Sequence, residues 1–119
     1  MNRALIVKKK WLDMILSGEK VWEIRGQDTS IRGKIGLIES GSGLIVGECR
    51  LMRSFNNVNE NDKRLKWLHG IDNWEETVRY KKPHIWLLTG PVRYEKPIPY
   101  NHPRGAVIWV KIDGLKGDE

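Results

Sequence analysis

The sequence predicts an α+β domain, built as a small, mostly antiparallel β-barrel flanked by two or three short helices. Three observations support this fold class. About six short apolar runs, several rich in β-branched residues, are separated by turn residues. One segment has clear helical spacing, and a long polar stretch holds only weaker helical patterns. Strand spacing alone does not distinguish a closed barrel from a packed sheet.

The first part of the chain reads as strand, helix and strand. Residues 3 to 7 form a short apolar run that predicts a strand. Residues 9 to 17 carry apolar side chains at helical spacing, and Gly18 follows as a C-terminal cap would. Residues 21 to 25 then predict a second strand.

The middle of the chain predicts a hairpin followed by helices. After a polar loop, residues 34 to 39 and 44 to 51 read as strands, and the Ser-Gly repeat at 40 to 43 is a hairpin turn signal. Residues 61 to 68 and 74 to 80 predict weak helices, the second with an N-cap at Asp72-Asn73.

The last part predicts three further strands. Residues 84 to 88, 92 to 95 and 106 to 112 are the apolar runs. Pro97, Pro99 and Pro103 mark the stretch before the final strand as an extended, non-helical crossing.

Length and composition limit the class of protein. With 119 residues we expect a single domain over residues 1–113 and a short polar tail over 114–119. One cysteine, Cys49, cannot form an internal disulfide, and no apolar stretch approaches the ~20 residues that span a bilayer. We therefore expect a cytoplasmic protein with no membrane partner.

The charge balance favours a polyanionic partner. Lys and Arg number 21 against 15 acidic residues, which gives a net charge of +6 and a pI near 9.6. Six tryptophans stand against one phenylalanine. Indole rings suit base stacking, but they equally suit a small core that needs bulk.

The most informative segment runs from Lys8 to Arg25. Three lysines, Lys8, Lys9 and Lys10, stand where the first helix begins, although cations there oppose the helix dipole at a cost of about 0.3 to 1 kcal/mol. They could bind phosphates, or they could be a solvated charge run. Both readings stay open.

Lys20, Trp22, Glu23 and Arg25 follow the glycine turn directly. Because alternate residues of a strand share a face, Lys20 and Trp22 would point one way and Glu23 and Arg25 the other. All four could face one pocket only if the strand bulges or has only just begun. A purely structural Glu–Arg pair is the alternative.

The remaining site signals are weaker. The three histidines lack metal-ligand spacing, so we expect neither a metal site nor a cofactor. His102 lies in a rigid polar loop and is the best histidine candidate for a ligand contact. No phosphate loop and no nucleophile elbow is present.

The G-x-K-x-x-E-x-R pattern of Gly18 to Arg25, with Arg32-Gly33 and Ile45-Val46-Gly47 downstream, resembles the signature of the ASCH domain. The resemblance extends over the strand at His84 and the closing run at Gly105, so it covers nearly the whole chain. It implies a PUA-like β-barrel that binds RNA or another nucleic acid in a cleft beside this motif.

Within that family, the resemblance also bears on catalysis. Small N4-acetylcytidine amidohydrolases use a Lys of this motif, a Thr three residues later and a distant Glu. Lys20 matches the Lys, but Glu23 stands at the Thr position, so that nucleophile does not carry over. Thr29 or Ser30 in the following loop could supply a hydroxyl instead.

The leading hypothesis is an RNA-binding module that recognises a specific or modified nucleotide in a basic cleft. The alternative is a hydrolase acting on RNA or a modified nucleoside, with Glu23 as general base and Lys20 as electrostatic stabiliser. A protein-interaction domain is a third reading. The expected nucleic-acid contacts are Lys8, Lys9, Lys10, Lys20, Trp22, Glu23, Arg25, Arg32 and His102.

Overall fold

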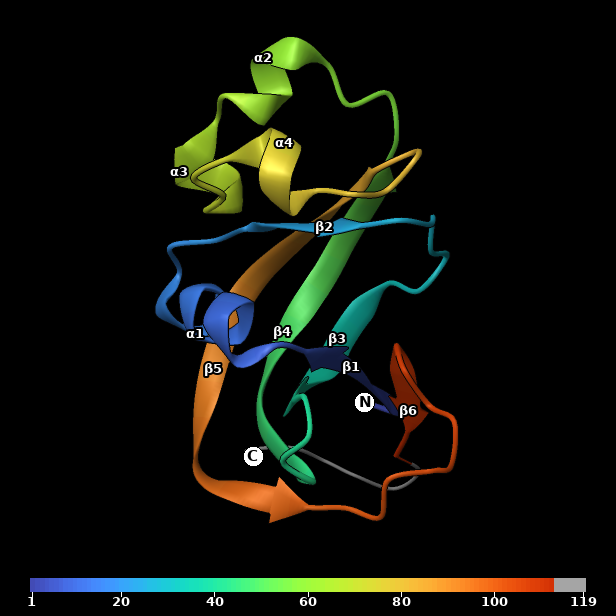
Figure 1. The fold of residues 1–119 in the computed structure, drawn as a ribbon. Helices are drawn as coiled ribbons and strands as arrows, with labels where there is room; N and C mark the ends of the chain where they lie inside the picture. The colour runs from blue at the N-terminus through green and yellow to red at the C-terminus, as the bar shows by residue number, and fades with distance from the viewer. Residues whose placement is uncertain (113–119) are drawn as a thin grey trace.

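A computed structural model describes residues 1–112 as an α+β fold with one mixed sheet and short helices (Figure 1). The elements in chain order are β1 (Arg3–Val7), α1 (Lys9–Ser17), β2 (Trp22–Arg25), β3 (Gly33–Glu39), β4 (Leu44–Phe55), α2 (Glu60–Lys63), α3 (Lys66–His69), α4 (Trp74–Thr77), β5 (His84–Pro99) and β6 (Trp109–Lys111). The tail expected at 114–119, and its boundary at 113, lie outside the described residues.

The six strands are ordered β2-β5-β4-β3-β1-β6. Neighbours are antiparallel except β1 and β3, which run parallel from Ala4↔Gly36 to Val7↔Glu39. The expectation of a mostly antiparallel sheet is therefore met in part. β1 and β3 can run parallel because the chain passes through α1 and β2 between them.

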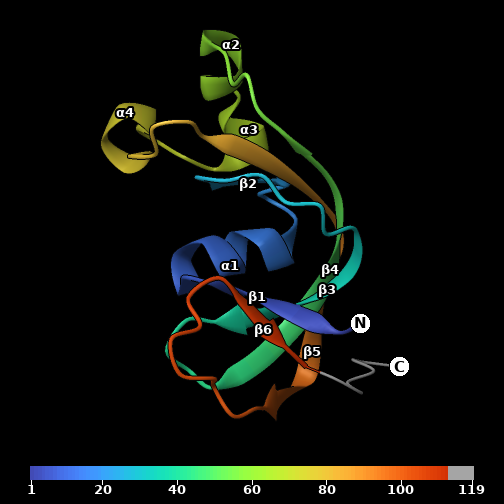
Figure 2. The ribbon, with the colours of Figure 1, turned by 90° about the vertical axis from the view of Figure 1, so that its right-hand side faces the viewer.

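The expected closed barrel is not formed. Within residues 1–112, β2 and β6 are the two edges of the sheet and do not pair. Figure 2 shows the sheet curving around α1, which lies inside the curve. The helix thus lies between β2 and β1, where closure of the sheet would otherwise bring strands together (Figure 1).

Two long strands replace shorter predicted ones. β4 extends to Phe55, and β5 joins the runs 84–88 and 92–95 into one strand. Register shifts between Glu48 and Arg50 of β4 let the pair bend without breaking. The prolines near the end of β5 are tolerated because β2 pairs only with its first residues, His84 to Leu87, so the later part of β5 has one free edge.

The helices after β4 are shorter than expected and gather at one end of the molecule (Figure 1). The helix predicted over 61–68 is split into α2 and α3, with Leu65 in a non-helical conformation between them. The predicted N-cap at Asn73 is present, since its side chain accepts a hydrogen bond from the Glu76 N–H. The last strand is confined to Trp109–Lys111, because Ala106 N–H donates to Pro103 O in a turn.

The main core lies between α1 and the sheet. Leu12 and Ile15 of α1 pack against a cluster that includes Trp86, Leu88 and Cys49. Burial raises the pKa of the Cys49 thiol to about 12. Within residues 1–112, no helix is long and apolar enough to span a membrane.

Candidate functional site

The turn after α1 determines where Lys20 lies. Gly18 adopts φ 87°, a left-handed conformation suited to glycine, and its N–H donates to Ile15 O. The chain then reverses, so that Lys20 N–H donates to Met14 O and Val21 N–H donates to Leu68 O. These bonds fix Lys20 two residues before β2, which begins at Trp22.

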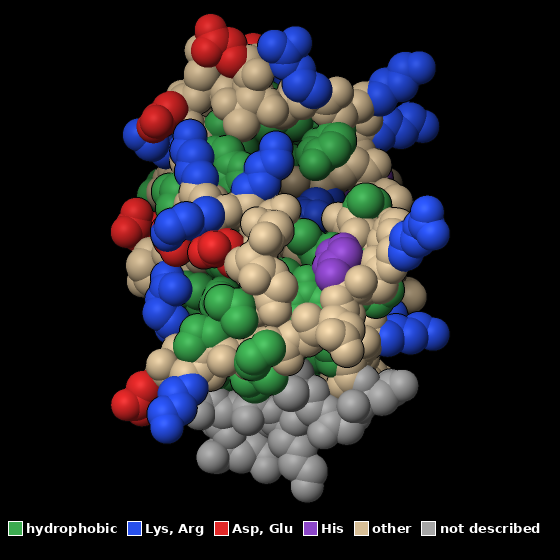
Figure 3. All heavy atoms as spheres, turned by 60° about the horizontal axis from the view of Figure 1, so that its bottom comes forward, with side chains coloured by type: hydrophobic (Ala, Val, Ile, Leu, Met, Phe, Trp, Pro, Cys, Tyr) green, Lys and Arg blue, Asp and Glu red, His purple; other side chains and the backbone are tan. Residues whose placement is uncertain are grey.

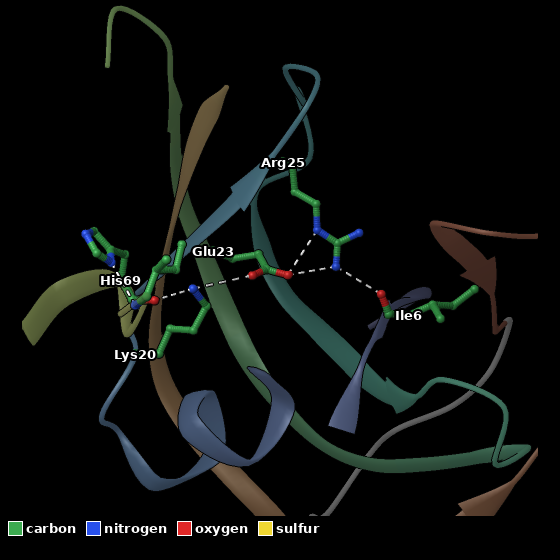
Figure 4. A network of polar contacts seen from close by, with 6 residues as sticks. Ile6, Lys20, Glu23, Arg25 and His69 are labelled. Atoms are coloured by element: carbon green, nitrogen blue, oxygen red, sulfur yellow. Dashed lines mark hydrogen bonds and ion pairs between the residues drawn. The ribbon is translucent and has the colours of Figure 1, made fainter. Parts of the chain in front are cut away.

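Lys20 begins a chain of polar contacts that crosses the interior (Figure 4). Its Nζ donates to His69 O at 2.5 Å and lies 3.8 Å from Glu23 Oε1. The other carboxylate oxygen, Oε2, accepts from Arg25 Nε at 3.0 Å and Nη2 at 2.8 Å. Arg25 Nη2 also donates to Ile6 O at 3.0 Å. One buried carboxylate therefore lies between two cations, and Arg25 links β2 to β1 by a side chain.

Strand parity explains which side chains meet. β2 begins only at Trp22, so Lys20 is not bound by its alternation and lies on the side of Glu23 and Arg25. Trp22 points the other way and packs edge-on against Phe55, with the ring centroids 5.9 Å apart. The structure therefore brings Lys20, Glu23 and Arg25 together and separates Trp22 from them.

Burial makes the Lys20 ammonium easier to deprotonate than that of a free lysine. Burial lowers the pKa of Lys20 to about 8, against the opposing effect of the Glu23 carboxylate. The Nζ also lies 4.9 Å from the centroid of the Trp11 ring, a distance at which the indole face attracts a cation.

A pocket of about 350 Å³ opens above this polar chain, with Lys20, Glu23 and Arg25 in its lining. Its walls come from segments far apart in the sequence. Lys8 and Trp11 belong to the start of α1, while Arg79 and Tyr80 follow α4. Val107, just before β6, completes the rim.

Tyr80 reaches the pocket because a glycine lies beneath it. A Cβ added to Gly26 would come within 2.6 Å of Tyr80 Cδ1, so the ring packs directly on the backbone next to Arg25. Tyr80 as a residue is 48% exposed. It can therefore contact a ligand at the pocket mouth.

Other candidates lie elsewhere. Lys9 pairs with Asp13 at 2.7 Å, and Arg32 donates to backbone carbonyls of its own loop. Lys10 lies over the Trp11 ring, 4.7 Å from its centroid. His102 uses both ring nitrogens within its loop, toward Tyr100 Oη at 2.7 Å and Ala106 O at 2.8 Å. None of these four residues is in the pocket lining.

Several pocket residues were not expected from the sequence. Trp11 lines the pocket, where Trp22 was expected. Its position next to the three lysines in the sequence could have indicated this. Tyr80 gave no signal, because its closeness to Gly26 arises from tertiary packing. The pocket lining holds the aliphatic hydroxyls of Ser40 and Thr77 and the phenol of Tyr80, and neither Thr29 nor Ser30 lines it.

His69 supports the site from outside the pocket. Its Nδ1 accepts from Ile71 N–H, which places the ring hydrogen on Nε2, and Nε2 donates to Lys63 O. Burial lowers the pKa of His69. The neutral ring thus fixes the loop whose carbonyl receives Lys20. Across residues 1–112, no group of three or more His, Cys, Asp or Glu side chains could hold a metal ion.

Comparison with known proteins places this arrangement in a family. Crystal structures of the ASCH protein of Zymomonas mobilis share the fold at 14% identity. A tyrosine-to-phenylalanine mutant aligns with a TM-score of 0.71, covering 94% of this chain and 90% of that chain. The unsubstituted protein aligns with a TM-score of 0.69, covering 94% and 87%.

Among curated proteins, no sequence matches this chain. The family model of the ASCH domain matches residues 5–98, which include α1, the Lys20–Glu23–Arg25 chain and most of β5. The match spans most of the chain and contains the polar chain described above. The protein therefore belongs to the ASCH domain family, whose fold is PUA-like.

Proposed function

We propose that the protein binds single-stranded RNA and holds one nucleotide in the pocket. The observation that carries this proposal is the pocket itself: about 350 Å³, with cations and aromatic rings in its walls. That volume falls within the range of small-ligand sites. Proteins that bind single strands combine such cations with rings on which bases stack. The proposal also agrees with the link between ASCH domains and RNA.

The phosphate contacts are assigned to the pocket rim. Lys8 is exposed at the N-terminus of α1, where the helix has no side-chain cap and no acidic residue in its first turn. Its ammonium and the free N–H groups there attract an anion. Arg79 is the second cation of the rim. Figure 3 shows Lys and Arg side chains along both flanks of one face, with apolar patches between them.

The base contacts are assigned to the interior. Trp11 and Tyr80 offer ring faces for stacking. Below them, the Lys20 Nζ donor and the Glu23 Oε1 acceptor are 3.8 Å apart. A base edge that carries an acceptor beside a donor could bond to both. Glu23 would then determine which base is preferred, whereas the rim cations would bind every sequence alike.

The test is binding of RNA oligonucleotides at several salt concentrations. The expected slope of log affinity against log salt is about −0.7 for each phosphate contacted. Lys8→Glu should weaken binding to all sequences, while Lys96→Glu, an exposed lysine at the far end of β5, serves as the charge-matched control. Affinity that is absent, or indifferent to salt, contradicts the proposal.

A second candidate function is hydrolysis of RNA or of a modified nucleoside. The observation that favours it is the buried Lys20, whose pKa of about 8 suits an active-site amine beside the Glu23 carboxylate. Incubation with labelled RNA and with N4-acetylcytidine separates the two functions. Turnover that disappears in Lys20→Ala supports the enzyme; retained binding without turnover supports the binding module.

A further inference from the structure

The helical end of the molecule exposes one indole. Trp67 of α3 is 74% exposed, whereas the other five tryptophans are buried or half-buried. An indole in water is unfavourable in the isolated chain, since Trp is highly buried on average. Three cationic residues, Lys63, Arg64 and Lys66, precede it directly. Lys63 pairs with Glu60 at 2.8 Å, so Arg64 and Lys66 are the cations that this surface presents beside the indole.

This surface is held rigidly against the motif that forms the pocket. α3 is tied to the start of the β2 region by Val21 N–H, which donates to Leu68 O at 2.9 Å. The next residue, His69, receives the Lys20 ammonium. Two residues further on, Ile71 lines the pocket. Trp67 thus lies on a segment that is hydrogen-bonded directly to the residues of the pocket wall.

Cations connect the pocket to Trp67. The Lys10 Nζ lies 4.7 Å from the centroid of the Trp11 ring. The hydrogen bond from Lys66 lowers the pKa of Asp72, and the charge of Lys10 adds to this effect. Asp72 in turn pairs with Lys66, beside Trp67. Both partners of this pair are well exposed, so a phosphate could displace Asp72 from Lys66 at little cost.

We propose that a single-stranded RNA held in the pocket continues over Lys10 and Lys66 and stacks a second base on Trp67. This inference rests on the proposed function, because it gives the direction in which the strand leaves the pocket. The stacked base can be of any kind, since every base has a flat face. Phosphates between the two bases would contact the two lysines.

The test compares a mononucleotide with tetranucleotides on the full chain. Trp67→Ala should weaken tetranucleotide binding roughly tenfold or more, while Trp67→Phe keeps most of it. Neither change should alter mononucleotide binding. Lys66→Glu should lower the steepness of the salt dependence by about 0.7 for tetranucleotides only, with Lys96→Glu as the control.

A direct readout is the indole N–H signal of Trp67 in an NMR spectrum, assigned by its loss in Trp67→Phe. It should shift with the tetranucleotide and stay in place with the mononucleotide. Equal tetranucleotide affinity in Trp67→Ala and in the unaltered protein overturns the inference but leaves the pocket proposal standing. A signal that shifts with protein concentration alone also overturns it, and indicates self-association. Tetranucleotide binding that depends on Trp67, without mononucleotide binding, would instead reject the pocket.

Discussion

At the scale of single residues, the buried ammonium of Lys20 makes stability depend on pH. The pKa of Lys20 is about 8 in the fold and 10.5 in a free side chain. Between these values the unfolded chain binds a proton that the native protein does not. The contribution of Lys20 to the free energy of unfolding therefore rises with pH across this window, by roughly 3 kcal/mol at about 1.4 kcal/mol per pKa unit.

The corresponding variant is Lys20→Met, which keeps a long side chain without the charge. We expect the stability difference between the unaltered protein and Lys20→Met to shift in favour of the unaltered protein from pH 8 to 10.5. Urea unfolding at several pH values measures it. The Cys49 thiol titrates in both proteins, so its contribution to the pH dependence cancels when the two are compared. A stability difference that does not change with pH would mean that the pKa of Lys20 is not lowered in the folded protein.

At the scale of elements, α1 begins without the features that normally stabilise a helix N-terminus. Lys8 occupies the N-cap position and makes no side-chain cap, and no acidic residue lies in the first turn. Lys8→Ser would supply a hydroxyl cap and remove a cation from the positive end of the dipole. We therefore expect a gain of about 0.5 to 1 kcal/mol in stability together with weaker RNA binding.

Thermal unfolding and oligonucleotide titration measure the two effects of Lys8→Ser. Lys10→Ser removes the same charge two residues further on, where a hydroxyl cannot cap the helix, and should gain less stability than Lys8→Ser. If Lys8→Ser stabilises the protein and leaves RNA affinity intact, the cation at this position has no binding role.

Two glycines that support different elements should respond differently to the same change. A Cβ on Gly47 of β4 would lie 2.5 Å from Val92 O and 2.8 Å from Leu16 Cδ2, so the backbone of β5 must shift and the Leu16 side chain must turn away. A Cβ on Gly26 meets the Tyr80 ring, which is half exposed and can swing away. We expect Gly47→Ala to cost about 1 to 3 kcal/mol of stability.

Gly26→Ala serves as the matched control for Gly47→Ala. It should change the free energy of unfolding by less than about 1 kcal/mol while weakening ligand binding to the extent that Tyr80→Ala does. Chemical unfolding of both variants checks the contrast. Equal destabilisation would mean that the Tyr80 segment is as rigid as the sheet.

The elements also show what the sequence could and could not predict. The helix over residues 9–17 and its glycine cap were predictable, because apolar spacing and Gly18 are local signals. The continuity of β5 was not, because it depends on register shifts against β4. Likewise, Glu23 and Arg25 could be paired by strand parity, whereas Tyr80 joined the pocket through tertiary packing over Gly26.

At the scale of the whole molecule, the sheet stays open and Arg25 bridges its β2 edge to β1. Its guanidinium donates both to Glu23 and to Ile6 O. Arg25→Gln removes these charge-assisted bonds, each worth about 1.5 to 3 kcal/mol. We expect amide exchange in β2 to quicken by roughly tenfold or more, with β3 and β4 little changed.

Native-state hydrogen exchange tests this expectation, because it measures the exchange rates of amides in edge strands and in central strands separately. A uniform acceleration in every strand would show that Arg25 stabilises the entire fold and not one edge. The α+β class was predictable from the apolar runs, but the open edge was not. Whether a curved sheet closes depends on what lies inside it, here α1, and spacing along the chain does not encode that (Figure 2).

The burial of Cys49 has a practical consequence for following this protein in solution. It is the chain's only cysteine, and its thiol stays protonated far above neutral pH. Maleimide dyes should leave it unmodified. In a Lys96→Cys variant the introduced thiol is exposed and lies outside the pocket lining, so it should be the one that a maleimide fluorophore labels, with Cys49 left in place.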